Sequence, residues 1–265
     1  MSVLTTYASQ SARDSGSPAS SNTGLCIFRT DTKAIEVSDG TNYLTYNNDG
    51  ITYDFSGSNS HSGVFDGSND YFDVGTVSEL NSSSDFSVSA WFNLSAASNF
   101  ESIFSGGTST SARAWVQIPS TTSIRIGVNS ALDDFTVSTL TVDGTQWYHL
   151  VATVLGTTAT LYLDGSSVGT ATCLVPASTA FNDVRIGGLN ASAFGGNTRL
   201  FNGKLDEVAL YNRAITSTEV SNIYNNKIYV APTAMYRLDG GVTDETGNYD
   251  GTNNGVEFST TDKPY

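Results

Sequence analysis

Few residues of this sequence have the types and spacing that enzyme chemistry requires. A Ser-His-Asp arrangement needs a histidine base, and the chain offers only His61 and His149. His149 lies in an alternating strand segment, where packed histidines are more common than catalytic ones, and no strand-to-helix nucleophile elbow is present. The acidic neighbours Asp206 and Glu207 are expected on opposite faces of a strand, so they would not act as a pair. These residues predict a protein that is not an enzyme.

The cysteines and the net charge exclude other classes of site. Cys26 and Cys173 are too far apart in the sequence for a metal-type or redox-type motif, so we expect two unpaired thiols. The net charge of −14 repels phosphate, which disfavours nucleic acid as a partner. No apolar stretch approaches the ~18 residues of a membrane span, and the first residues lack the pattern of a signal peptide.

The elements that must position any site are strands. Ser, Thr, Asn and Gly make up 115 of the 265 residues, and β-branched and aromatic residues are plentiful, which favours strands joined by polar turns. The regular spacing of the strand candidates predicts an all-β protein, an antiparallel two-sheet sandwich or barrel. One short helix is expected near 217–225, where Thr216 and Glu219 form a capping box. The strand candidates are 63–65, 71–74, 86–92, 102–104, 114–118, 123–128, 135–137, 147–155, 158–163, 184–186 and 205–212.

The N-terminal region differs from the rest. Residues 1–24 are rich in Ser, Thr and Ala and are expected to form an arm, and three short strands are predicted within 25–46. Three short strands bury little surface, so this piece needs a partner surface. We therefore divide the chain into 1–48, an arm with a small β-meander, and 49–265, the sandwich.

Four segments carry a resemblance to a known family. They are 63–72 (GVFDGSNDYF), 86–92 (FSVSAWF), 147–152 (WYHLVA) with 161–165 (LYLDG), and 201–215 (FNGKLDEVALYNRAI). Taken in this order, they resemble the laminin-G-like jelly roll of the concanavalin A-like lectin/glucanase superfamily. The resemblance implies two curved antiparallel sheets packed face to face. It also implies glycan binding on the concave face or rim loops, and in many members a calcium ion.

This resemblance nominates two site residues. Asp206 is the best single candidate ligand for calcium, with the capping of loop amides as the alternative role. Trp115 is the first candidate for stacking on a glycan, because it lies in a polar context between Arg113 and Gln117; core packing is the alternative. Glucanases of this superfamily carry a Glu-x-Asp-x-x-Glu pattern on one strand. None of the seven glutamates here begins that pattern, which again predicts a non-enzyme.

The C-terminal segment 234–265 resembles the beginning of a laminin-G-like domain, so its usual place would be ahead of 63–72. Either the chain stops within a second repeat, or the domain is circularly permuted and this segment supplies the first strands. We favour permutation, because a truncated repeat would expose Tyr236, Val256 and Phe258. Donation of the segment to a neighbouring subunit is a variant of the same hypothesis.

The run 24–49 resembles a small β module of phage tail-fibre and head-decoration proteins, although a plain β-meander would have the same pattern. With the sandwich, it predicts a non-enzymatic phage virion surface protein that adheres to glycans or host surfaces. Such a protein would form a homo-oligomer, for example a trimer, and contact other virion proteins through its N-terminal region. The alternative is a secreted bacterial carbohydrate-binding module. A glycan-cleaving enzyme is the third and least favoured hypothesis.

Overall fold

The computed structural model describes the backbone of 5–7, 26–29, 34–38, 43–47 and 50–54, and residues 59–97, 100–190, 193–195 and 199–265 in full. The chain forms two compact units. One comprises Met1–Ser58 and Ser221–Ala231, and the other comprises Asn59–Val220 and Pro232–Tyr265.

The first unit contains a six-stranded sheet. Its order is β1 (Thr5–Tyr7), β2 (Cys26–Arg29), β3 (Ala34–Ser38), β4 (Tyr43–Asn47), β5 (Gly50–Asp54) and β18 (Ile228–Val230). β1 is parallel to β2, and the other pairs are antiparallel. The three predicted strands correspond to β2, β3 and β4. The unit extends beyond the predicted boundary at residue 48, because β5 and β18 continue the sheet. Apart from β1, the expected arm at 1–24 lies outside the described residues.

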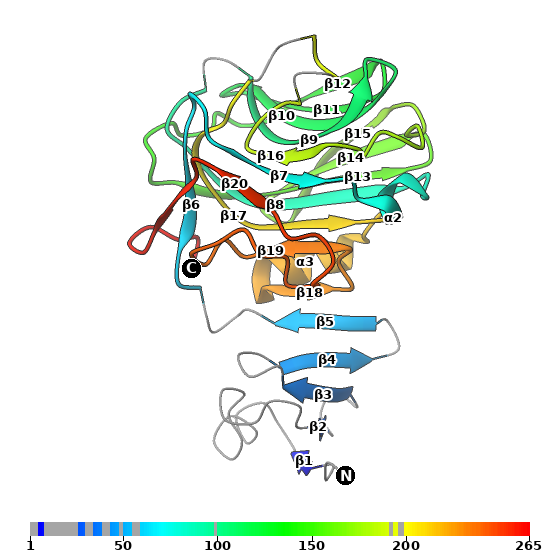
Figure 1. The fold of residues 1–265 in the computed structure, drawn as a ribbon, viewed down its shortest axis with the longest axis vertical. Coiled ribbons are helices and arrows are strands. Elements are labelled where there is room, and N and C mark those ends of the chain that lie inside the picture. The colour runs from blue at the N-terminus through cyan, green and yellow to red at the C-terminus, as the bar shows by residue number, and fades with distance from the viewer. Residues whose placement is uncertain are drawn as a thin grey trace. The chain divides into compact units, whose positions relative to one another are not determined.

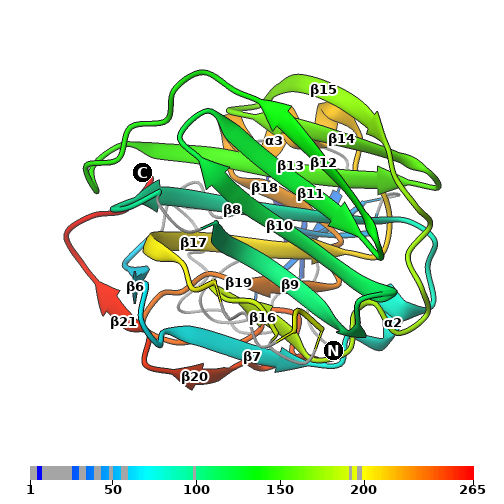
Figure 2. The same cartoon turned by 90° about the horizontal axis from the view of Figure 1, so that it is seen from above.

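The second unit is a sandwich of two antiparallel sheets, as Figures 1 and 2 show. The seven-stranded sheet has the order β12 (Ala131–Thr136), β11 (Ser123–Val128), β10 (Ala112–Ser120), β9 (Glu101–Ser109), β16 (Val184–Ile186), β7 (Tyr71–Gly75) and β20 (Thr252–Asn254). The eight-stranded sheet has the order β15 (Ser166–Thr172), β14 (Thr158–Leu163), β13 (Trp147–Leu155), β8 (Phe86–Leu94), β17 (Asn202–Tyr211), β6 (Ser62–Asp66) and β21 (Glu257–Ser259). β19 (Ala234–Tyr236) pairs with β17. The predicted fold class is confirmed.

Strand alternation decides which side chains form the core between the sheets. In β10, Ala114, Val116 and Ile118 are fully buried in the core cluster. Because successive side chains of a strand point to opposite faces, Arg113, Trp115 and Gln117 are turned to the other face of the seven-stranded sheet. The same alternation in β8 buries Val88, Ala90 and Phe92 in the core. The outer face of the seven-stranded sheet therefore carries polar and aromatic side chains in a fixed order.

The C-terminal segment contributes strands to both sheets. β20 pairs with β7, β21 pairs with β6, and β19 pairs with β17. Tyr236 and Val256 are buried in the core, and the Tyr236 ring packs edge-on against Phe72 with 5.1 Å between centroids. The evolutionary origin of this arrangement by permutation stays a prediction.

Two helices lie within the described residues. α3 (Ser217–Asn226) begins where predicted: the Glu219 amide donates to Thr216 Oγ1 at 3.2 Å, and the Thr216 amide donates to Glu219 Oε2 at 2.8 Å. α2 (Ser78–Asn81) has four residues and buries Leu80. The prediction of a single helix missed α2, because four residues are too few to show a helical period.

Candidate functional site

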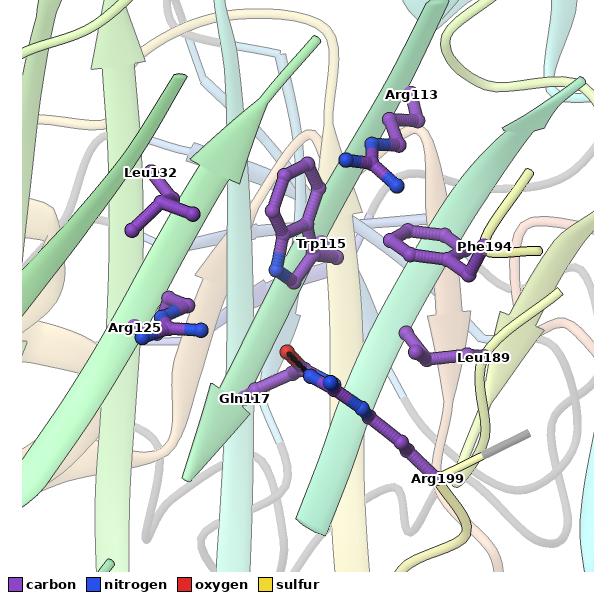
Figure 3. Close-up of a pocket in the computed structure, with 8 residues that line it drawn as sticks. All are labelled: Arg113, Trp115, Gln117, Arg125, Leu132, Leu189, Phe194 and Arg199. Carbon is purple, nitrogen blue, oxygen red and sulfur yellow. Dashed lines mark hydrogen bonds between the residues drawn. The ribbon is translucent and has the colours of Figure 1, made fainter. Parts of the chain in front are cut away.

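A pocket of about 260 Å³ opens on the face of the seven-stranded sheet that is turned away from the core. β10, β11 and β12 supply five of its residues, and the connection between β16 and β17 supplies the other three (Figure 3). The lining residues are Arg113, Trp115, Gln117, Arg125, Leu132, Leu189, Phe194 and Arg199.

The Trp115 ring forms one wall of the pocket. Trp115 lies opposite Gly127 across the β10–β11 pair, and the missing side chain of Gly127 leaves the space that the indole fills. A Cβ at Gly127 would lie 2.1 Å from the ring. The Phe194 ring meets the indole edge-on at 5.3 Å, and the Arg113 guanidinium lies 4.5 Å from the indole centroid (Figure 3). Only 4% of Trp115 is exposed.

The burial of Trp115 limits the ring surface that could stack on a glycan. Trp115 is outside the hydrophobic core, as a binding role requires, but neighbouring side chains cover most of its surface. Phe194 and Leu132 are more accessible, and half of Leu132 is exposed. A stacking role for Trp115 stays a prediction, with Phe194 as the more accessible ring.

Three arginines surround this aromatic wall. Arg113 donates from Nε to the Asn129 carbonyl at 3.0 Å and from Nη1 to the Ala193 carbonyl at 3.1 Å. Arg125 forms a two-pronged ion pair with Asp134 on β12, with both distances at 2.7 Å. The contacts of Arg113 and Arg125 fix both side chains in place.

Arg199 is held more loosely. Its Nη1 lies 3.5 Å from Gln117 Oε1 (Figure 3), and its guanidinium lies 4.2 Å from the centroid of the Phe100 ring. Gln117 is itself fully buried and donates from Nε2 to the Phe100 carbonyl at 3.4 Å. Arg199 is therefore placed by weak contacts at the mouth of the pocket.

The electrostatics of the pocket follow from these contacts. Burial lowers the pKa of Arg113, and the charge of Arg199 lowers it further. Burial and the charge of Arg125 lower the pKa of Arg199 in the same way. The hydrogen bonds that Arg125 donates to Asp134 raise the pKa of Arg125 against the opposing effect of burial. An arginine stays protonated despite such shifts, so the pocket is a positive region on an acidic protein.

Asp206 lies elsewhere, on the outer face of the eight-stranded sheet. It is fully buried, its Oδ2 accepts a hydrogen bond from Asn59 Nδ2 at 2.8 Å, and its Oδ1 accepts one from the Glu207 amide at 2.9 Å. Burial and the charge of Glu207 raise its pKa well above the ordinary value.

The expectation that Asp206 and Glu207 point to opposite faces is wrong. The register of β17 against β8 shifts between Asp206 and Ala209, and Glu207 adopts a left-handed backbone with φ of 47°. This irregularity breaks the alternation, so both carboxylates lie beside Tyr265 and raise the pKa of its hydroxyl, in addition to the larger effect of burial.

The side chains around Asp206 do not supply the ligand set of calcium. Calcium binds six to eight oxygens in most proteins. Both carboxylate oxygens of Asp206 already accept hydrogen bonds from N–H donors. In the part of the chain that the structure describes, no group of three or more His, Cys, Asp or Glu side chains could hold a metal ion. Calcium at Asp206 stays a prediction that a chelation experiment decides.

Sequence reasoning nominated one of the eight lining residues, Trp115, because it lies in a polar context between Arg113 and Gln117. It did not nominate the other lining residues, among them Arg125, Phe194 and Arg199. Arg125 had a signal, because it stands between Ile124 and Ile126 in an alternating strand. His149 is packed as predicted: it is fully buried, with Nε2 2.9 Å from Ser89 Oγ.

A family model described as the concanavalin A-like lectin/glucanases superfamily matches residues 66–221, which is more than half of the chain. The chain belongs to this superfamily. The match confirms the laminin-G-like resemblance that the four sequence segments indicated. β19, β20 and β21 lie outside the matched residues of this superfamily member. The resemblance of 24–49 to phage proteins stays a prediction.

Two solved structures resemble this superfamily member. One is a protein from Bacteroides ovatus ATCC 8483 named as a candidate carbohydrate binding protein, with a TM-score of 0.57 and 18% identity over 77% of this chain. The other is the native heptameric SAP-like pentraxin from Limulus polyphemus, with a TM-score of 0.55 and 17% identity over 76% of this chain and 95% of its own. This chain spans 60% of the Bacteroides protein. At these identities the likeness establishes the fold alone.

Comparison with curated proteins gives no match. Within the described residues, no helix has both the length and the apolar character of a membrane span.

Proposed function

We propose that this chain is a carbohydrate-binding module that binds a glycan in the pocket of the seven-stranded sheet and does not cleave it. The observation that carries the proposal is the pocket itself, where an aromatic wall and fixed polar donors meet on one face of a lectin-type sandwich. Pockets of this composition suit sugars, which present apolar C–H faces and hydroxyl groups together. The Bacteroides protein named as a candidate carbohydrate binding protein supports the same function class.

The lining residues would have two different roles in binding a sugar. Phe194 and Leu132 offer apolar surface at the rim, and the guanidinium groups of Arg113 and Arg199, which line the same pocket (Figure 3), would donate N–H groups to sugar oxygens. Gln117 keeps Arg199 in position through its Oε1 atom. A ligand bound here would contact side chains of β10, β11 and β12 and of the segment between β16 and β17.

The absence of cleavage is part of the proposal. The pocket is lined by no carboxylate, and glycoside hydrolysis in most enzymes uses a pair of them. Asp206 and Glu207 lie on the other sheet and are fully buried.

The virion role has weaker support than the binding module. Only the resemblance of 24–49 to phage modules favours it, and the superfamily match begins after that run. Assembly as a homo-oligomer such as a trimer also stays a prediction; heptameric assembly is a property of the Limulus pentraxin. Light scattering of the purified chain would measure its oligomeric state, and imaging of particles with a specific antibody would test the virion location.

A glycan array with the purified chain tests the proposed function. We expect binding to a defined subset of glycans, with no release of reducing sugar during incubation. Phe194→Ala should weaken that binding about three- to tenfold, the usual value of one aromatic contact. Leu155→Ala is the matched control, because Leu155 is an exposed apolar residue at the end of β13, on the other sheet. Equal loss in both variants, or no binding to any glycan, would refute the proposal.

A further inference from the structure

The pocket has a positive charge that its lining residues do not neutralise. Three of the chain's eight arginines line it, and in the described part of the chain the one carboxylate paired with them is Asp134, which binds Arg125. Among the residues that the structure describes, Arg113 and Arg199 form no ion pair; their polar contacts are backbone carbonyls and an amide oxygen. The pocket thus carries two uncompensated positive charges.

The sequence around the pocket supplies no missing carboxylate either. The neighbouring segments that the structure does not describe are 98–99, 191–192 and 196–198, and they contain only Ala, Gly, Ser, Thr and Asn. On a chain with a net charge of −14, no acidic residue is among the described residues that line the pocket.

We infer that the pocket selects an anionic sugar, whose carboxylate or sulfate group binds between Arg113 and Arg199. This inference rests on the proposed function and adds the chemical class of the ligand. A planar guanidinium recognises a carboxylate or sulfate through paired, charge-assisted hydrogen bonds, which are stronger than those to neutral hydroxyls.

The donors needed for such an anion are available. Arg113 uses Nε and Nη1 for backbone carbonyls and keeps Nη2 for a ligand. Arg199 uses only Nη1, in its contact with Gln117, and keeps Nε and Nη2. Arg125 is engaged by Asp134 through Nε and Nη2, so it contributes positive charge more than free donors.

The size of the pocket limits the ligand. Its volume of about 260 Å³ is just below the ~300 Å³ at the lower end of small-molecule sites. It therefore suits one acidic residue at the end or edge of a glycan, with the adjoining neutral sugar against Phe194 and Leu132 at the rim.

The test compares neutral sugars with acidic counterparts. Calorimetry or surface plasmon resonance of the full chain would compare lactose, 3′-sialyllactose and 3′-sulfolactose, and galactotriose with trigalacturonic acid. We expect at least one acidic probe to bind about tenfold or more tightly than its neutral parent. Binding of 3′-sialyllactose or trigalacturonic acid would indicate that the pocket recognises a carboxylate, and binding of 3′-sulfolactose would indicate that it recognises a sulfate. Affinity should fall as NaCl rises from 0.05 to 0.5 M.

Arg199 is the residue to change, because Arg113 also holds two backbone carbonyls and its loss would disturb the fold. Arg199→Gln should abolish the preference for the acidic probe, and Arg199→Lys should keep part of it. Arg213→Gln is the matched control: it removes the same charge from a residue that pairs with Glu219. The melting temperature of each variant shows whether the fold is intact.

The outcomes separate the two proposals. A preference for an acidic probe that disappears in Arg199→Gln but persists in Arg213→Gln supports the inference. Binding of neutral and acidic probes with equal affinity overturns it and leaves the proposed function standing. An acid preference that Arg199→Gln leaves unchanged also overturns it. Failure to bind any probe, here and on the array, overturns both.

Discussion

Replacing Gly127 by alanine would test the geometry of the pocket without removing any of its lining side chains. The φ of Gly127 is not positive, so the backbone accepts alanine, but the new Cβ would lie 2.1 Å from the Trp115 ring. The ring cannot remain there, because real Cβ contacts below 3.0 Å essentially do not occur. The indole must be displaced from Gly127, which changes its contacts with Phe194 and Arg113.

The expected loss of stability follows from two opposing effects. Forcing an extra methyl group into a packed site costs about 1–3 kcal/mol. Replacing a glycine by alanine in a strand interior stabilises the fold by about 0.5–1 kcal/mol, because the unfolded chain then has fewer conformations to lose on folding. The net destabilisation is about 1 kcal/mol, which lowers Tm by about 2–4 °C for a unit of this size. Ligand affinity should fall as well, since the displaced ring fills part of the pocket.

Gly169→Ala is the matched control. Gly169 also lies in a strand, without a positive φ, and a Cβ there would meet only the Phe135 ring at an ordinary 3.9 Å. We expect its Tm to stay level or to rise. Differential scanning calorimetry and near-ultraviolet circular dichroism measure both variants. If Gly127→Ala is as stable as Gly169→Ala and keeps the wild-type aromatic signal, the Trp115 ring does not lie over Gly127 and our account of the pocket wall is wrong.

Three further predictions concern the rest of the sandwich. Burial and the charge of Glu207 raise the pKa of Asp206 in the folded state. At a pH above that raised pKa the ionised Asp206 destabilises the fold, and this effect disappears as the pH falls through the raised pKa. Glu207→Gln should therefore raise Tm near pH 7.5 by about 2–4 °C, which corresponds to a gain of ~1 kcal/mol in the free energy of unfolding, and this gain should vanish near pH 4. A difference in Tm that stays constant across pH would contradict this. Ending the chain at Ala231 removes β19, β20 and β21 with five residues of the core cluster, so we expect an aggregated product in gel filtration; a soluble, equally stable monomer would show that the segment is dispensable. Chelation by EDTA should leave Tm within about 1 °C, because the side chains at Asp206 do not complete a calcium site; a larger fall, reversed by added calcium, would establish the predicted metal.

The strands were predictable because each alternates between the core and an outer face. Trp115 on β10 was nominated through its polar neighbours in the sequence, Arg113 and Gln117. The rest of the pocket was not predictable in this way. Phe194 and Arg199 lie between β16 and β17, where no periodicity exists, and they reach β10 only through the folding of the sheet. The irregularity at Glu207 was missed although the sequence carries a sign of it: Asp206 and Glu207 separate the core residues Leu205 and Val208, and a spacing of three does not fit strict alternation.

The pairing of β20 and β21 has a consequence for synthesis on the ribosome. β6 and β7 are made long before their outer neighbours: the hydroxyl of Ser62 donates to the carbonyl of Asp262, 200 residues later. A nascent chain grows at only ~5–20 residues per second, so the edges of β6 and β7 remain open for many seconds. Contacts between such distant residues also slow folding after release. The nascent sandwich therefore has to be kept from pairing with other chains until its C-terminal strands emerge.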